Sequence, residues 1–210
     1  MKRALVIVAA IAAAAPAHAL DWQDFGAGEA PAESPWKDFD APASPEEMIA
    51  LGVATDLAEM MRNRTAGAGT LLRGAEGEPP LGLQWPIEST GSVTLVQQLR
   101  AELGKRGLVV FVSERNYGTG PDRVAIARAA EPFEVIAKRS VPPALKPEEW
   151  VAKLRAWHAK APWDLLGAGV DWLEIEFREA PADPDRWVDE IVAAAPAVAE
   201  SRDGRTALRE

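Results

Sequence analysis

Acidic side chains gather in one short segment of the C-terminal half. Asp171 precedes Glu174 and Glu176, and one apolar residue separates the two glutamates. Residues two apart in a strand point to the same face and lie roughly 6 to 7 Å apart. A glycosidase or a site for a hard cation uses such a pair of carboxylates. The same pattern is typical of the solvated face of an antiparallel strand, so the sequence leaves both interpretations open.

Three aromatic or imidazole side chains bear on this chemistry. Trp172 shares the expected face of the two glutamates, where an indole can stack on a sugar or cover a neighbouring strand or helix. His158 lies near the end of an expected helix, beside apolar residues, and we expect it to be structural. Tyr117, the only tyrosine, lies in a long polar hairpin connection of a kind that can bind ligands. The candidate catalytic residues are Asp171, Glu174, Glu176 and His158, and Trp172 and Tyr117 are candidate binding residues.

Composition and motifs exclude several other kinds of site. The chain has no cysteine, which excludes disulfides and thiolate chemistry. Zinc sites usually need several His or Cys ligands, and the chain has only two histidines. The glycine pairs within 67–69, 118–120 and 167–169 lack the lysine or the third glycine of a phosphate-binding loop. We therefore expect neither a metal nor a cofactor.

Residues 1–19 have the pattern of a secretory signal peptide. Two basic residues are followed by an apolar run over 4–15 and by a small-x-small site that ends at Ala19. We expect cleavage after Ala19 and a periplasmic or secreted protein. The apolar run is shorter than the roughly 18 to 20 residues that span a bilayer, so we expect no stable membrane insertion after cleavage.

The charge of the chain bears on its partners. Removal of residues 1–19 takes away two basic residues and no acidic one, which changes the formal charge from −9 to −11. An acidic protein repels phosphate backbones and anionic lipids, so we do not expect a nucleic acid as the partner. An unknown protein or small molecule remains the expected partner.

Residues 20–44 form a leader that is rich in proline, alanine and acidic residues and shows no helical or strand period. A Trp-x-Asp-Phe sequence framed by Trp22 and Phe25 returns with Trp36 and Phe39. These four aromatics are further candidate binding residues. The repeat either docks on a partner or on the folded domain, or packs loosely on the nearest apolar surface.

The N-terminal α/β part of the folded domain, residues 45–132, carries clear helix signals. Ser44 and Glu47 form a capping box before a helix that should reach about residue 62. The segment 65–92, dense in glycine and proline, predicts either a loop-rich region or the rim of an active site. The further elements expected are a helix over 93–105, with Ser92 as its cap, and hairpin strands over 108–112 and 122–129.

Residues 133–210 form the second part of the folded domain. Its expected elements are a strand over 133–139, a helix over 147–161, strands over 163–166 and 170–178, a helix after Asp183 and a short strand over 197–201. This order is that of the split βαβ unit in ferredoxin-like folds. The chain is therefore predicted to be α+β, with helices packed on a mixed or antiparallel sheet and a ferredoxin-like C-terminal half.

The same half resembles a known family. Gly-Ala-Gly-x-Asp-Trp-x-Glu over 167–174, with Val151–Trp157 before it and Pro181–Asp183 after it, resembles the bacterial domain of unknown function 4253. The resemblance runs from about Leu108 to the end and implies an α+β fold with no assigned activity. The last helix of the family ends in Cys-Pro-Asp, where this chain has Ala195-Pro196-Ala197. Any function of that cysteine or acid is absent here, and loss of a thiol suits export.

The sequence favours one function over another without a motif that identifies either. Two features favour an exported, non-catalytic binding or interaction module of the bacterial cell envelope. The sequence has no catalytic constellation, and its leader contains the aromatic repeat. The alternative is a hydrolase that uses the carboxylates, glycosidase-like or metal-assisted, and it requires Asp171, Glu174 and Glu176 to converge in one pocket.

Overall fold

A computed structural model of the full-length chain describes the backbone of residues 5–9 and all atoms of residues 41–74, 78–116, 119–142, 144–170 and 172–195. Several sequence predictions fall outside these residues. They are the leader aromatics Trp22, Phe25, Trp36 and Phe39, the candidates Tyr117 and Asp171, the positions Pro196 and Ala197, and the strand expected over 197–201.

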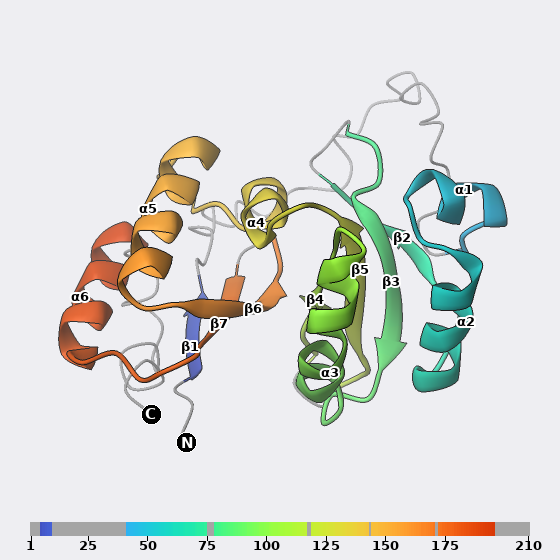
Figure 1. Ribbon diagram of the computed structural model, residues 1–210, viewed down its shortest axis with the longest axis horizontal. Coiled ribbons are helices and arrows are strands. Elements are labelled where there is room, and N and C mark those ends of the chain that lie inside the picture. Colours follow the sequence, from blue (N-terminus) through green and yellow to red (C-terminus); the bar gives the residue numbers. More distant parts are fainter. Residues whose placement is uncertain are drawn as a thin grey trace, which may run out of the picture.

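One mixed sheet runs through the molecule (Figure 1). Its strand order is β1-β7-β6-β4-β5-β3-β2, and every neighbouring pair is antiparallel except β4 and β6. The strands are β1 (Leu5–Ala9), β2 (Thr70–Leu72), β3 (Gly82–Ile87), β4 (Leu108–Glu114), β5 (Asp122–Arg128), β6 (Trp163–Ala168) and β7 (Trp172–Phe177). The predicted α+β class with a mixed sheet is thereby confirmed.

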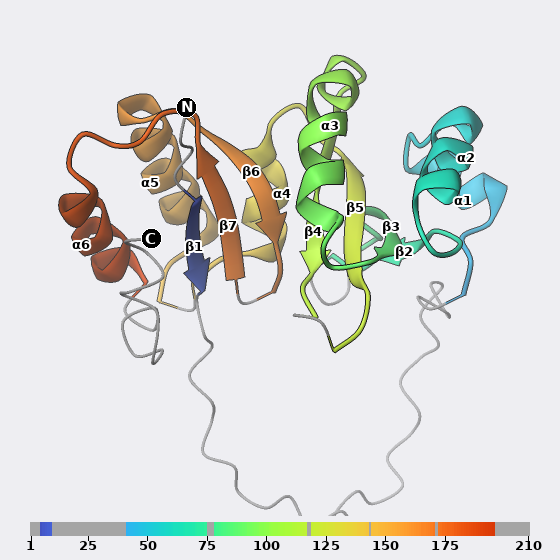
Figure 2. The same ribbon diagram turned by 90° about the horizontal axis from the view of Figure 1, so that it is seen from below.

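Helices cover both faces of this sheet, with α3 on one side and α4 and α5 on the other (Figure 2). The helices are α1 (Pro45–Ala50), α2 (Thr55–Arg64), α3 (Ser92–Lys105), α4 (Pro132–Arg139), α5 (Pro147–Lys160) and α6 (Pro184–Ala194). Two apolar clusters result. One joins α2 and α3 to β2, β3, β4, β5 and Leu166 of β6, and the other joins α4, α5 and α6 to β4, β5, β6, β7 and Leu72 of β2.

Successive side chains of β4 point to opposite faces of the sheet and so contribute to both clusters. Val110 and Val112 belong to the cluster under α3, and Phe111 between them belongs to the cluster under α5. A continuous apolar run is what a strand covered on both faces requires. Both clusters are therefore parts of one domain that share the same sheet.

The first helical segment follows its cap signals, with one interruption. Ser44 and Glu47 form the expected capping box. The single helix expected to residue 62 is divided into α1 and α2, because Gly52 adopts a φ of +74° between them. A positive φ ends a right-handed helix and favours glycine, so Gly52 acts here as a stop and not as a tolerated interior residue.

The strand expected over 133–139 is wrong, because these residues form α4. Pro132 occupies the first turn, and Glu131 and Glu134 form a reciprocal capping box. The buried residues Phe133 and Val135 have the two-residue spacing of one strand face, whereas Phe133 and Ile136 have the three-residue spacing of one helix face. The C-terminal half therefore begins with two successive helices, α4 and α5, and its described elements do not have the order of a split βαβ unit.

Candidate functional site

The two glutamates of β7 are buried. Glu174 and Glu176 are only 3% and 6% exposed, so their face of the strand is not solvated. They lie on the α3 side of the sheet, opposite the buried Leu173 and Ile175. A buried carboxylate needs a cation or several hydrogen-bond donors, and the surrounding side chains supply both.

Glu174 is held by Arg115, which follows β4. The Nε and Nη2 atoms of Arg115 both donate to Glu174 Oε2, at 3.1 and 2.5 Å. Its Nη1 atom donates to Asp122 Oδ2 at 3.1 Å and to the hydroxyl oxygen of Ser92 at 3.0 Å. One guanidinium therefore links the start of β5, the start of α3 and the middle of β7.

Asp122 lies at the centre of this buried network and is fully buried. Its Oδ1 atom accepts from the hydroxyl of Ser89 and from the backbone N–H of Asn116, both at 2.9 Å, and its Oδ2 atom accepts from Ser92 at 2.7 Å. Burial alone would raise the pKa of Asp122, but these hydrogen bonds and the nearby Arg115 lower it below its ordinary value. Asp122 is therefore held as a carboxylate.

The pKa of Arg115 changes in the matching direction. Burial opposes its charge, but the hydrogen bonds and charges of Glu174 and Asp122 raise the pKa of Arg115 above its ordinary value. The group is an ion-pair network in which each charge stabilises its neighbours. A carboxylate so held is a poor general acid or nucleophile, since neither protonation nor attack is favoured by its surroundings.

Glu176 belongs to a second polar cluster between α3 and the strands β6 and β7. Its two carboxylate oxygens accept from Gln97 Nε2 at 3.1 and 3.2 Å, and Arg100 Nη2 lies 3.7 Å from Oε2. Arg100 also pairs with Asp164 at 2.7 Å, and Arg178 approaches Asp164 at 3.0 Å from the other side. The two β7 glutamates are thus bound to different partners and do not form a pair facing a common cavity.

His158 lies on the other face of the sheet from Glu174 and Glu176. Its ring packs edge-on against Phe133 and Trp163, and its Nδ1 atom accepts from the backbone N–H of Trp163 at 3.3 Å. Burial, and then the charge of Arg178, lowers the pKa of His158. A neutral imidazole therefore links the end of α5 to the start of β6, and His158 does not meet the carboxylates in one pocket.

Trp172 packs over the turn between β6 and β7. A Cβ atom on Gly169 would lie 1.9 Å from the Nε1 atom of Trp172, and one on Gly167 would lie 2.4 Å from its Cζ3 atom. Neither of these glycines has a positive φ, which among the described glycines only Gly52 and Gly107 adopt. Gly167 and Gly169 instead leave room for the indole, so the Gly-Ala-Gly run and Trp172 form one packing unit.

Arg139 donates to backbone carbonyls at or beside the ends of three strands. It donates from Nε to Ala168 O at 3.1 Å, from Nη1 to Arg73 O at 2.7 Å and from Nη2 to Ser113 O at 3.3 Å. Burial lowers the pKa of Arg139. The side chain therefore ties the ends of β2, β4 and β6 together through backbone carbonyls.

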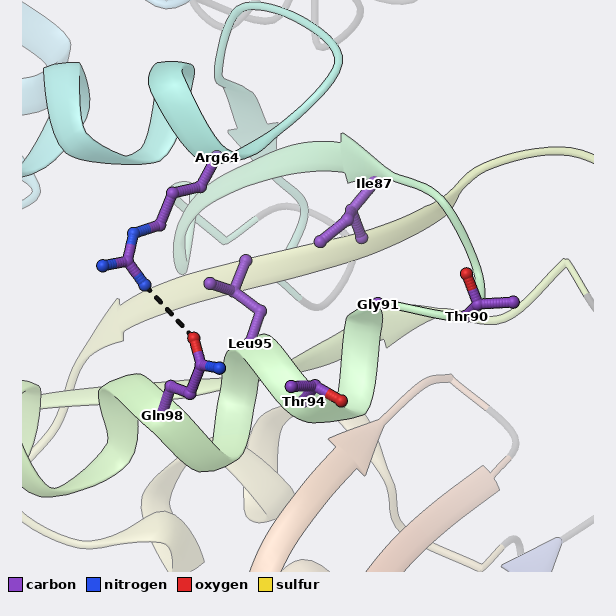
Figure 3. A pocket seen from close by; sticks show the side chains of 7 residues that line it. All are labelled: Arg64, Ile87, Thr90, Gly91, Thr94, Leu95 and Gln98. Carbon is purple, nitrogen blue, oxygen red and sulfur yellow. Dashed lines mark hydrogen bonds between the residues drawn. The ribbon is translucent and has the colours of Figure 1, made fainter.

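A hollow of about 660 Å³ lies between the end of α2, the end of β3 and the start of α3 (Figure 3). We call it the α2–α3 groove. Buried Ile87 and Leu95 form its floor, and Arg64 reaches across it from α2 to Gln98 Oε1 at 3.3 Å. Its lining residues are Arg64, Ile87, Thr90, Gly91, Thr94, Leu95 and Gln98.

Sequence reasoning did not find this groove. Its residues come from three elements, and the only hint was the glycine- and proline-rich segment 65–92, which lies beside it. Ser92 was expected to cap α3, but Gly91 is the N-cap residue and the Ser92 side chain is drawn into the Asp122 network instead. No motif marks Arg64 or Thr94, because exposed polar residues at helix ends are common.

The described residues offer neither a cluster of metal ligands nor a helix that could cross a membrane. No group of three His, Cys, Asp or Glu side chains is arranged there to hold a metal ion. None of the helices in these ranges has the length and apolar character needed to cross a bilayer. The resemblance to the domain of unknown function 4253 stays a prediction. No known protein family, curated protein or solved structure was found to match the chain.

Proposed function

We propose that the protein is an exported, non-catalytic binding module of the cell envelope, and that its α2–α3 groove takes a short peptide segment carrying a carboxylate. The observation that supports this most directly is the contrast between two sets of polar groups. The described candidates for catalysis, Glu174, Glu176 and His158, are all engaged within the fold. The exposed polar residues of the groove surround an apolar floor.

The chemistry of the groove favours an anionic group on the ligand. Arg64 is the single charged residue in the lining. The first turn of α3 opens into the groove and contains no acidic residue. Its N-cap residue is Gly91, which has no side chain to accept a hydrogen bond from the backbone N–H groups of that turn. A helix N-terminus attracts negative charge, so it adds to the field of Arg64. Thr90, Thr94 and Gln98 supply hydrogen-bonding groups, and Ile87 and Leu95 supply an apolar contact.

The size and shape of the groove suit a segment better than a whole domain. Pockets for small molecules span about 300 to 1,000 Å³. The volume of the groove, about 660 Å³, lies within this range, and the groove is widely open to solvent. An extended segment of a few residues can therefore enter without a change in the fold.

Matched peptides and matched variants test this proposal. Two sets of short peptides are titrated into the exported chain. One set carries Asp and Glu, and the other carries Asn and Gln at the same positions. We expect the acidic peptides to bind, and Arg64→Gln to weaken that binding at least fivefold. Arg62→Gln, an exposed change on the same helix outside the groove lining, should alter it less than twofold. Equal binding of the acidic and neutral peptides, or equal effects of the two variants, would contradict the proposal.

A further inference from the structure

The outer edge of β7 is occupied by a segment that export would remove. In the full-length chain β1 pairs with β7 antiparallel, from Leu5 opposite Glu176 to Ala9 opposite Trp172, with no shift of register. β1 lies within residues 1–19, the expected signal peptide. When that segment leaves, no other strand of the described residues pairs with this side of β7, and its outward backbone N–H and C=O groups become available to a new strand.

β7 lacks the features that usually protect an edge strand. Natural edge strands are often short or carry proline, lysine or a bulge. β2, at the opposite edge, has three residues, and Thr70 in it forms a bridge with Pro42. β7 has six residues, none of them proline or lysine. Its two glutamates bind Arg115 and Gln97 on the α3 side, so they do not repel an uncharged strand at this edge.

We propose that the outer edge of β7 is an acceptor site for an extended apolar strand of another exported protein. The inference rests on the proposed export of the chain, because the edge opens only when residues 1–19 are removed. Strand addition takes its affinity from main-chain hydrogen bonds and its specificity from alternate side chains. The pairing with β1 shows that β7 can accept an antiparallel strand over Trp172–Glu176.

The two faces of β7 define the chemistry of the added strand. Leu173 and Ile175 are 2% and 0% exposed and belong to the apolar cluster of α4, α5 and α6. Residues of the partner opposite these two positions continue that cluster and should be apolar. Residues opposite Glu174 and Glu176 need no positive charge, because Arg115 and Gln97 already bind the two carboxylates. An apolar strand therefore fits better than a basic one.

A second copy of this chain is a poorer occupant. Two β7 strands that pair antiparallel, with their buried faces on the same side, place glutamates opposite glutamates. With Ile175 on the twofold axis, for example, Glu174 lies opposite Glu176 of the second copy. Like charges directly opposite each other destabilise a strand pair. The geometry therefore favours a different chain as the donor.

Backbone methylation of a peptide probe tests the acceptor site directly. The probe is residues 4–10 followed by two lysines and a fluorophore, titrated by anisotropy against the chain that begins at Leu20. Alternate residues of an added strand direct their N–H groups to the acceptor. We expect N-methylation of one alternate set, either residues 5, 7 and 9 or residues 6 and 8, to weaken binding at least tenfold. Methylation of the other set should change it less than twofold. Equal effects of both sets, or no saturable binding, overturn the proposal.

The full-length chain is the matched control. Cell-free synthesis without membranes retains residues 1–19, and this chain should bind the probe at least tenfold more weakly because β1 fills the edge. If the chain from Leu20 does not unfold cooperatively, a protease site placed after Ala19 allows the segment to be cut after folding. Equal binding to the intact and cut chains overturns the proposal.

The same samples separate this inference from the proposed function. The groove proposal fails if the acidic peptides do not bind, whatever the probe does. Export fails if the chain isolated from cells still begins at Met1. The acceptor site fails if the probe does not bind while the acidic peptides bind and the exported chain begins at Leu20.

Discussion

Replacement of Arg115 by methionine tests whether the buried ion-pair network stabilises the fold. Arg115 is 14% exposed at its side chain, and its partners Glu174 and Asp122 are 4% and 1% exposed. Removal of one partner from a buried pair usually costs about 3 to 5 kcal/mol, because the remaining charge stays buried without compensation. The change is long and apolar, so it keeps most of the side-chain volume of Arg115.

The structure places the expected loss at the lower end of that range. Asp122 keeps three other donors in the variant, Ser89, Ser92 and the N–H of Asn116. Glu174 loses both of its hydrogen bonds from Arg115. The cost therefore comes mainly from one unpaired carboxylate, and we expect Arg115→Met to lower the free energy of unfolding by about 3 kcal/mol at pH 7.

Urea unfolding measures this loss. Glu174→Gln added to Arg115→Met should recover part of the stability, because it removes the unpaired charge. In the parent chain the pKa of Asp122 is lowered, so the stability that Asp122 contributes is present above its unfolded pKa and is lost as the pH falls through its folded pKa.

Arg106→Met is the matched control. Arg106 is 42% exposed and pairs with Asp56 and Glu102, which are 67% and 63% exposed. Exposed ion pairs contribute less than about 1 kcal/mol. The reasoning is refuted if Arg115→Met costs no more than Arg106→Met, or if Glu174→Gln recovers none of the stability that Arg115→Met loses.

Two further predictions concern the β6–β7 turn and His158. Gly169→Ala should lower the free energy of unfolding by about 1 to 3 kcal/mol, because the new Cβ meets the indole of Trp172. Trp172→Leu should reduce that penalty. The control is Gly104→Ala, in a helix with open space around it, which should stabilise the chain by about 0.5 to 1 kcal/mol. Similar costs at both glycines would contradict this prediction. The pKa of His158 is lowered, so the parent chain should lose stability as the pH falls from its unfolded value of about 6.5 through the folded one. His158→Gln should remove that part of the pH dependence in thermal unfolding, and an unchanged profile would show that the imidazole is not the responsible group.

Local signals predicted much of the fold. The capping box at Ser44, the proline that opens α5 and the glycine that ends α3 act within one turn of chain, so the sequence contains them in full. The exception is α4, where the buried Phe133 and Val135 have the spacing of a strand and the buried Phe133 and Ile136 have that of a helix. Pro132 and the capping box of Glu131 and Glu134 decide for the helix.

Long-range contacts explain what the sequence could not predict about the site. An alternating strand with two glutamates is solvated or buried according to what lies above it. Here Gln97 and Arg115, distant from Glu174 and Glu176 along the chain, lie against them and supply the donors. The α2–α3 groove is likewise a product of three elements brought together by the sheet.

The parallel junction of β4 and β6 has a consequence for communication across the molecule. In the described residues these strands share one register pair, Val112 with Gly167, and Arg139 adds a bridge from Ser113 O to Ala168 O. The α2–α3 groove lies on one side of this junction, and the outer edge of β7 lies on the other. Coupling between two sites must pass through physical contacts that both sites bias. Occupancy of one surface can therefore reach the other by three routes: this junction, the Arg115 network beside it, and the α3 side chains Gln97 and Arg100, which lie against Glu176 of β7.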